Sequence, residues 1–490
     1  MASPNGAATN TKPGHSDSIP ATHLFATFIA SARPSHLTAE QRSKVKEVLL
    51  DYIGVTLGAN QHADSTAPIL KSITALQGPA ITKAATSGVC SVVGQGVGRW
   101  LPQYAGLLNA ALGHSLDFDD TYAPGTLHAG VTAIPAALAT AEYLSTLGQE
   151  VGPERLILAV AVSYEVTCRI GRELGYAAYS RGFHNTSTAG IFGAVAAIAM
   201  LKGLNAEVVE HAFGVAGSKA AGSMQYLENG SWNKRLHPGF AVHDAWMSVQ
   251  MAEAGVVGAA KILEGKSGFF NAYTPSAGVD LGRLTQGLGS EWCWLASSLK
   301  PYPACRMTHG FIELCGKLHE QYRSSTSHPP SPQDIEKVQL WMSPSNFILI
   351  GDPTPNKRHP TNNIDAQFSA YFQVANALIF GAKTGDMNPY SRLADPSINT
   401  LTEKIDVKTD EGMKQFSARL EVSWADGRSD TKAQEAPLGE VEHPFTRDLV
   451  EQKFHSLVDP VFGEQKAAKI AEMLDGLDSG SVMALVELLR

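Results

Sequence analysis

Apolar residues recur at helical spacing over most of residues 20–280. The run LTAEQRSKVKEVLLDYIGVTLGA places its apolar positions on one helical face, and Thr38 followed by Gln41 forms a capping-box pattern at its start. The stretches 134–148, 154–174 and 189–201 repeat the helical pattern with many Ala and Gly, which is typical of closely packed buried helices. We therefore predict a large helical domain in this part of the chain.

The pattern changes near residues 285–300. Residues 328–353 begin as a proline-rich loop and continue as a strand-like run. Residues 404–410 and 416–429 are typical of two further strands, the second ending in an Asp-Gly turn, and residues 362–381 between these segments are helical. After about residue 440 the pattern is helical again. An α+β segment thus interrupts a helical protein.

The fold prediction is a mainly α protein, with a large all-helical domain and a smaller inserted α+β lid domain facing it across a cleft. The predicted bounds are a disordered tail at 1–20, the helical domain at 21–290, the lid at 291–440, and C-terminal helices at 441–490 that return to the helical domain.

Composition narrows the class of protein. Only 18% of residues are charged against 44% hydrophobic, which favours buried helices and a subunit interface. The formal net charge of -8 argues against nucleic acid or an anionic membrane as the partner, although a local basic pocket can still bind a small anion. Five scattered cysteines and no signal-peptide pattern favour a reducing, cytoplasmic location.

Four polar segments interrupt the apolar pattern and carry the candidate chemistry. GHSLDFDDTYAPGTLHAG (113–130) contains Asp117, Thr121 and His128 just before a helix, and RGFHNTSTAG (181–190) repeats this arrangement with His184. A histidine at a helix N-terminus faces the positive end of the helix dipole, which disfavours its protonation. Solvated helix ends would explain each segment separately, but the repetition favours an acid–base site.

The other two segments supply cations. SWNKRLHPGFAVHD (231–244) carries Lys234, Arg235 and His237, and the two adjacent cations suit a carboxylate ligand. A solvated loop, or a surface cation–π pair between Lys234 and Trp232, is the alternative.

SLKPYPACRMTHGFIE (298–313) carries Lys300, Cys305 and Arg306 at the expected domain junction, where a proline-rich linker is the alternative. The neighbouring arginine could lower the pKa of Cys305, or the thiol could be a small buried hydrophobic group.

Several specific motifs are absent from the sequence. GQGVGRW (94–100) does not match the dinucleotide-binding GxGxxG pattern, and there is no Walker A, HExxH or GxSxG element. The histidines and cysteines lack known metal-ligand spacings. We therefore expect acid–base chemistry with no metal and no cofactor.

These segments together resemble the MmgE/PrpD family, which includes 2-methylcitrate dehydratases and cis-aconitate decarboxylases. The resemblance extends over nearly the whole chain after residue 20 and rests on the runs HSLDFDDTYAPGTLHAG, RGFHNTSTAGIFGAVAA, GSMQYLENGSWNKRLHPGFAVH, KPYPACRMTHG and NIDAQFSAYF. It implies a helical domain with an α+β lid, a homodimer, and no cofactor.

The resemblance also implies site residues. Those that match family active-site positions are Asp117, Thr121, His128, His184 and Lys234. Arg235, His237, Lys300, Cys305 and Arg306 complete the predicted substrate-binding set. Mammalian-type decarboxylases of the family carry His where this chain has Cys305 and Tyr near Phe347, whereas fungal relatives resemble this chain in having Cys.

The resulting prediction is a cytoplasmic lyase for a citrate- or aconitate-type tricarboxylic acid, most simply a decarboxylase of the cis-aconitate type. A 2-methylcitrate or 2-alkylcitrate dehydratase uses the same pocket and is the first alternative. Epimerisation of a dicarboxylate and a non-catalytic carboxylate-binding dimer are the further alternatives.

Overall fold

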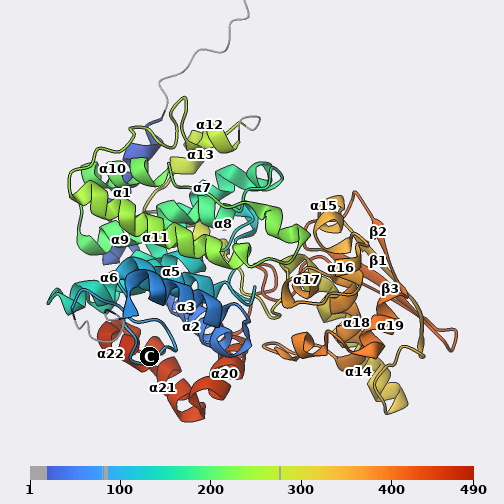
Figure 1. Cartoon of the computed structure of the whole chain (residues 1–490). Coiled ribbons are helices and arrows are strands. Elements are labelled where there is room, and N and C mark those ends of the chain that lie inside the picture. The colour runs from blue at the N-terminus through green and yellow to red at the C-terminus, as the bar shows by residue number, and fades with distance from the viewer. Residues whose placement is uncertain (1–18, 80, 82–86, 275–277) are drawn as a thin grey trace, which may run out of the picture.

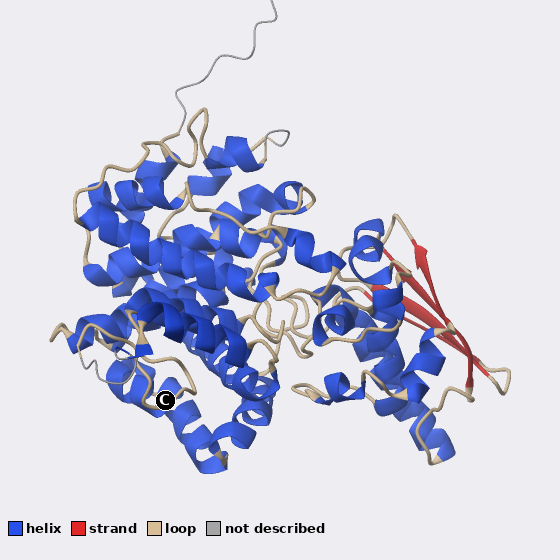
Figure 2. Ribbon diagram, in the orientation of Figure 1, coloured by secondary structure: helices blue, strands red, loops and turns tan. Residues whose placement is uncertain are grey.

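The computed structural model describes residues 19–79, 81, 87–274 and 278–490. The predicted tail at 1–20 therefore falls almost wholly outside the described residues. The described part of the chain is mainly helical and carries one small sheet, which confirms the predicted fold class (Figure 2). None of its helices is long and apolar enough to cross a bilayer.

The first part of the chain forms a packed helical body (Figure 1). Its helices are α1 (Ala21–Ser31), α2 (Ala39–His62), α3 (Thr66–Gln77), α5 (Pro102–Gly113), α6 (Gly130–Thr146), α7 (Pro153–Tyr179), α8 (Asn185–Thr188), α9 (Gly190–Lys202), α10 (Ala206–Ala216), α11 (Asn233–Glu253), α12 (Phe269–Tyr273) and α13 (Leu281–Thr285). The capping box of α2 is confirmed: Gln41 N donates to the Thr38 hydroxyl, and Thr38 N donates to Gln41 Oε1.

The second part forms a smaller body in which Figure 2 shows the sheet on the edge far from the first. Its elements are α14 (His309–Thr326), β1 (Ile335–Met342), α15 (Pro344–Asn346), α16 (Pro355–Arg358), α17 (Asn363–Gln367), α18 (Ala370–Phe380), α19 (Pro396–Thr402), β2 (Ile405–Thr409), β3 (Ala418–Trp424) and β4 (Ser429–Gln434). The strand order is β2-β1-β3-β4, with β1 parallel to β2 and the other pairs antiparallel.

Three details of this second body differ from the sequence prediction. The strand-like run ends at Met342, because Pro344 starts a helical turn. The Asp426-Gly427 turn leads into β4, a strand that the prediction missed since its alternation is polar and largely exposed. Residues 362–381 form two helices, because the Ser369 hydroxyl accepts from Phe372 N and starts α18.

Two large hydrophobic cores follow these two bodies. One contains buried residues of 21–299 together with residues of 450–489, and the other contains buried residues of 302–424. The last helices, α20 (Arg447–Phe462), α21 (Glu464–Asp475) and α22 (Val482–Leu488), thus pack on the first body, and α20 lies along α2. The predicted domain bounds and the lid role stay predictions, since packing alone does not define a folding unit or a motion.

A buried ion pair joins α20 to α2. Lys453 Nζ lies 2.6 Å from Asp51 Oδ1 and also donates to the Phe118 carbonyl at 2.7 Å. Both side chains are almost completely buried. Helix α20 therefore contacts the polar segment 113–130 directly.

We expect Lys453→Met to destabilise the protein by about 3–5 kcal/mol, because the substitution leaves the Asp51 charge buried without its cation. Urea unfolding measures the effect. The double variant Asp51→Asn/Lys453→Met removes both charges and should recover part of the loss. Equal stability of wild type and Lys453→Met would contradict the role of this pair.

Candidate active site

A hollow between the two bodies is lined by residues of all four polar segments. Its volume is about 510 Å³ including its open mouth. Most of the predicted site residues line it, namely Asp117, Thr121, His128, His184, Lys234, Lys300, Cys305 and Arg306. Phe368, Gln415 and Phe416 of the second body also contribute. We call this hollow the central cavity.

The segment between α5 and α6 forms one wall of the cavity. Asp117 adopts a left-handed backbone conformation with φ of 50°, which is uncommon for a residue with a side chain. Thr121 pairs through its backbone with Ser298, N to O at 2.8 and 2.7 Å. Three consecutive carbonyls of this segment accept hydrogen bonds from distant parts of the chain.

Each of the three donors belongs to a different region. Gln367 Nε2 donates to Leu116 O at 2.9 Å, Lys300 Nζ to Asp117 O at 2.7 Å, and Lys453 Nζ to Phe118 O at 2.7 Å. These donors, which belong to α17, to the connection between the bodies and to α20, stabilise the uncommon backbone conformation of the segment.

Asp117 is the centre of the cationic part of the cavity. Its Oδ1 forms ion pairs with Lys234 in the first turn of α11 and with Lys300 at 3.0 Å. Burial raises the pKa of Asp117, but the Lys234 and Lys300 ammonium groups lower it more, so the carboxylate stays ionised. Since both lysines share one carboxylate oxygen, they retain capacity to bind a further anion.

Lys234 is buried, and its ammonium lies 5.2 Å from the centroid of the Phe368 ring. The alternative of a surface cation–π pair with Trp232 is therefore wrong. Arg306 also lines the cavity, and its guanidinium forms a buried ion pair with Glu440. Three cations from two of the polar segments thus surround one small space.

His128 and His184 lie at the edge of the same space. His128 Nε2 is 4.0 Å from Asp117 Oδ1, and the His128 backbone N–H donates to the Thr186 hydroxyl, which joins the two histidine segments. Burial lowers the pKa of His128, and the nearby lysines lower it further, while Asp119 opposes them. Burial and neighbouring His237 hold the pKa of His184 well below its usual range. Both rings are neutral bases near pH 7.

The remaining predicted residues have different surroundings. His237 Nδ1 lies 3.1 Å from His184 Nδ1, so it contacts a cavity residue without lining the cavity. The Arg235 side chain points elsewhere and pairs with Asp64 and Ser65, so its assignment to substrate binding has no support in its position. Burial, then the Asp117 charge, raises the pKa of Cys305 to about 11, so of the two alternatives for this thiol the structure favours the buried hydrophobic group.

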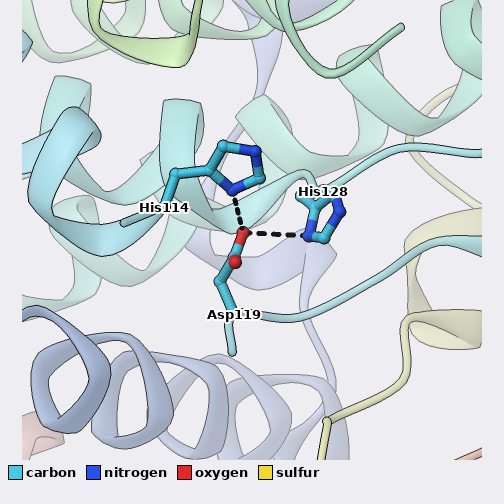
Figure 3. Close-up of side chains that lie close together, drawn as sticks. All are labelled: His114, Asp119 and His128. Carbon is cyan, nitrogen blue, oxygen red and sulfur yellow. Dashed lines mark hydrogen bonds and ion pairs between the residues drawn. The ribbon is translucent and has the colours of Figure 1, made fainter. Parts of the chain in front are cut away.

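Two residues to which the sequence prediction gave no role, Asp119 and His114, lie next to His128. Asp119 Oδ2 lies 2.9 Å from His128 Nδ1 and 2.8 Å from His114 Nδ1, so one carboxylate oxygen contacts two imidazoles (Figure 3). The dense Asp and His content of residues 113–130 was the available signal. Spacing alone did not distinguish these residues from their neighbours.

These three side chains also form a possible metal site, since one ligand atom of each lies within 4.8 Å of the others. Two observations favour a hydrogen-bonded group instead. The first is that both rings already contact the same Asp119 oxygen. The second is that the positive charges of Lys234 and Lys300 oppose a further cation; together with burial, these charges lower the pKa of His128.

Asp120 belongs to the same segment but does not line the cavity. Its Oδ1 accepts from Gly130 N at 3.0 Å at the start of α6. A Cβ on Gly130 would lie 2.3 Å from that same oxygen, so the close approach requires glycine. Burial, and then the charges of Asp119 and Asp51, raise the pKa of Asp120 to about 8.

From the raised pKa of Asp120 we predict that the stability of the protein depends on pH. Between its ordinary pKa of 3.8 and about 8 the folded state holds a proton that the unfolded chain releases, so this group destabilises the fold as pH rises through that range. Asp120→Asn cannot ionise and keeps the acceptor for Gly130 N. The unfolding free energy of Asp120→Asn relative to wild type should therefore increase from about pH 5 to about pH 8 in urea titrations. A pH-independent difference would contradict the assignment.

The fold and the cavity define a class of protein: a mainly helical protein of two bodies, with cations and histidines lining a cavity between them. Comparison with known families agrees, since the MmgE/PrpD N-terminal domain matches residues 23–281 and the MmgE/PrpD C-terminal domain matches residues 302–479. The chain belongs to the MmgE/PrpD family.

Curated relatives cover most of the chain. A cis-aconitate decarboxylase of Aspergillus terreus is 27% identical over 419 residues, which cover 82% of this chain and 84% of the relative. A cis-aconitate decarboxylase-like protein, oryM, of Aspergillus oryzae is 25% identical over 93% of this chain and 94% of its own length. The human cis-aconitate decarboxylase is 24% identical over 94% and 93%. Family and relatives together indicate a lyase.

Proposed function

We propose that this protein is a cofactor-independent lyase that decarboxylates a tricarboxylic acid of the cis-aconitate type. The observation that carries the proposal is the central cavity, where Lys234, Lys300 and Arg306 surround a space edged by two neutral histidines. Asp117 and Glu440 balance two of these three cations, so the space keeps a net positive charge that attracts a carboxylate-bearing substrate. The names of the curated relatives support the choice of acid and of reaction.

Substrate binding comes first in the mechanism. Lys234 and Lys300 each form an ion pair with Asp117, and these pairs fix both ammonium groups in the cavity wall. Their remaining donors, with Arg306, bind and orient the substrate carboxylates. Thr121 offers a hydroxyl at the same wall. The added negative charge raises the pKa of His128, so the ring takes up a proton.

The chemical step then follows. The bond between carbon and the departing carboxylate breaks, CO₂ leaves, and the electron pair remains on carbon as an allylic carbanion that spreads into a neighbouring carboxylate. The lysine ammonium groups stabilise this charge where it develops. His128 then gives its proton to the carbon, and the neutral ring regains a proton from solvent. Overall one proton is consumed for each CO₂ released.

A dehydratase acting on a 2-methylcitrate-type acid is the second candidate. The lowered pKa values of His128 and His184 favour it, because a neutral imidazole can remove the proton beside a carboxylate. The other ring, or a water, would then protonate the departing hydroxyl. The two reactions share all of the anion-binding groups and differ in which bond to carbon breaks.

A proton NMR time course of the purified chain, with chelator present, tests the proposal. cis-Aconitate and 2-methylcitrate are offered separately. New terminal methylene signals with bicarbonate release support the decarboxylase, and conversion of the hydroxy acid to an alkene without bicarbonate supports the dehydratase. Loss of turnover on chelation, restored by a metal, would overturn the metal-free mechanism. Silence with both acids would move the search to longer alkylcitrates or to epimerisation. The predicted homodimer and cytoplasmic location are separate proposals.

A further inference from the structure

We propose that Asp119 and His114 are positioning residues that hold His128 with its Nε2 facing the central cavity as the group that transfers the proton. Neither Asp119 nor His114 lines the cavity, so both act through His128. The part of the inference that concerns proton transfer by His128 rests on the proposed function. The geometry that carries it, one carboxylate oxygen shared by two imidazoles, is independent of which acid is bound (Figure 3).

The first step of the argument concerns the position of the protons. Burial raises the pKa of Asp119, but its interactions with the His114 and His128 rings lower it more, so its carboxylate is ionised and can only accept. His114 Nδ1 therefore carries a hydrogen and donates it to Oδ2, and His128 Nδ1 lies 2.9 Å from the same oxygen, whose negative charge favours a hydrogen on that nitrogen. A neutral His128 then has its lone pair on Nε2, and a protonated His128 has its acidic hydrogen there. The catalytic atom faces the cavity in both states.

The second step concerns charge. The titratable and charged groups that face His128 and Asp119 are Asp117, Asp120, His114, His184, Lys234 of α11, Lys300, Asp51 of α2 and Lys453 of α20. Burial and the two cavity lysines oppose a positive charge on His128, and Asp119 is the nearest carboxylate that favours it. Without this carboxylate, the cations that bind the substrate would prevent His128 from becoming an acid.

The third step assigns a role to His114. Its Nδ1 donates to the Asp119 oxygen that His128 Nδ1 contacts, so it withdraws charge from Asp119 and weakens the hold of Asp119 on the His128 proton. Burial lowers the pKa of His114 to about 4, so the ring stays neutral. Its Nε2 is buried and has no hydrogen-bond partner among the described residues, a cost of about 1–3 kcal/mol.

Asp119→Asn tests the pair. The amide keeps the shape but removes the charge, so we expect kcat/KM near pH 7 to fall about 10²-fold. We also expect the descending limb of the pH profile to move to lower pH by about 1–3 units, the shift produced by removing an opposite charge at this range. A reduced melting temperature with an unmoved pH profile would overturn the proposal.

His114 variants separate a positioning role from packing. His114→Leu removes the competing donor, so the limb should move to higher pH, opposite to Asp119→Asn. His114→Asn restores a donor near the Nδ1 position and should bring the limb back towards wild type. If His114→Leu moved the limb in the same direction as Asp119→Asn, the assigned role of His114 would be overturned. Asp244→Asn is the matched control, because it removes a carboxylate 2.9 Å from Nδ1 of the half-buried His243 on α11, outside the cavity lining.

A second readout does not depend on turnover. Titration of ¹⁵N-histidine-labelled protein, with the His128 signal assigned from His128→Gln, follows the ring in the ligand-free chain. Asp119→Asn should lower the titration midpoint of His128, and Asp244→Asn should not change it. An unchanged midpoint overturns the pair even if the enzyme is active. A lowered midpoint in a chain that is silent with both acids supports the pair and counts against the proposed function alone.

Discussion

Lys234→Met is expected to lower kcat/KM for the tricarboxylate by about 10³-fold, the range found when one group that stabilises developing charge is removed. The methionine side chain approximates the length and apolar surface of lysine, so packing against Phe368 is largely kept while the charge is lost. Because Lys234 meets the substrate charge both when it binds and when it moves to carbon, KM should rise and kcat should fall.

Two features make the expected effect of Lys234 large. The ammonium is buried in a cavity, where a charge acts more strongly than at the surface, and the Asp117 carboxylate that it neutralises would otherwise face the anionic substrate. Lys219→Met on the exposed surface is the control and should retain wild-type rates, because the Lys219 side chain is 57% exposed. A Lys234→Met enzyme within threefold of wild type would remove this lysine from the site.

The second large effect is expected at the histidines. His128→Gln and His184→Gln should each lose about 10²-fold or more in kcat, which is typical for a residue that transfers a proton. A non-catalytic carboxylate-binding protein predicts no turnover above background for wild type or for either variant. His455→Gln, a partly exposed histidine paired with Asp459 on α20, is the control. Wild-type rates in both cavity variants would refute the site assignment.

The pH dependence of wild type adds a signed test of His128 as the acid. Burial and the lysines lower the pKa of His128 in the free protein, whereas bound carboxylates raise it. Activity that needs the protonated ring is lost as pH rises through that pKa. The descending limb of kcat, which reports the complex, should therefore lie at higher pH than the limb of kcat/KM, which reports the free enzyme. An ascending limb with this pKa, in place of the descending one, would indicate that His128 acts as the base.

Much of the helical body could be predicted because its signals are local. The Thr38–Gln41 capping box, the apolar face of α2 and the long apolar runs of α6, α7 and α9 depend on residues a few positions apart. The polar strand β4 could not be predicted in this way, because it exists through its pairing with β3. The helix break at Ser369 was missed for a related reason: a single capping hydroxyl decides it, and Phe368 at that break lines the cavity.

The sequence by itself determined the residue types of the site and the segments that carry them, since clustered Asp, His and Lys in an apolar chain are visible without a fold. Only the tertiary structure decided which of them meet. It turned Arg235 towards Asp64, placed Asp119 between two imidazoles, and raised the pKa of Cys305 by burial. The physical reason is distance along the chain: the donors that hold the carbonyls of residues 116–118 lie 183 to 335 residues away, and no local pattern records such bonds.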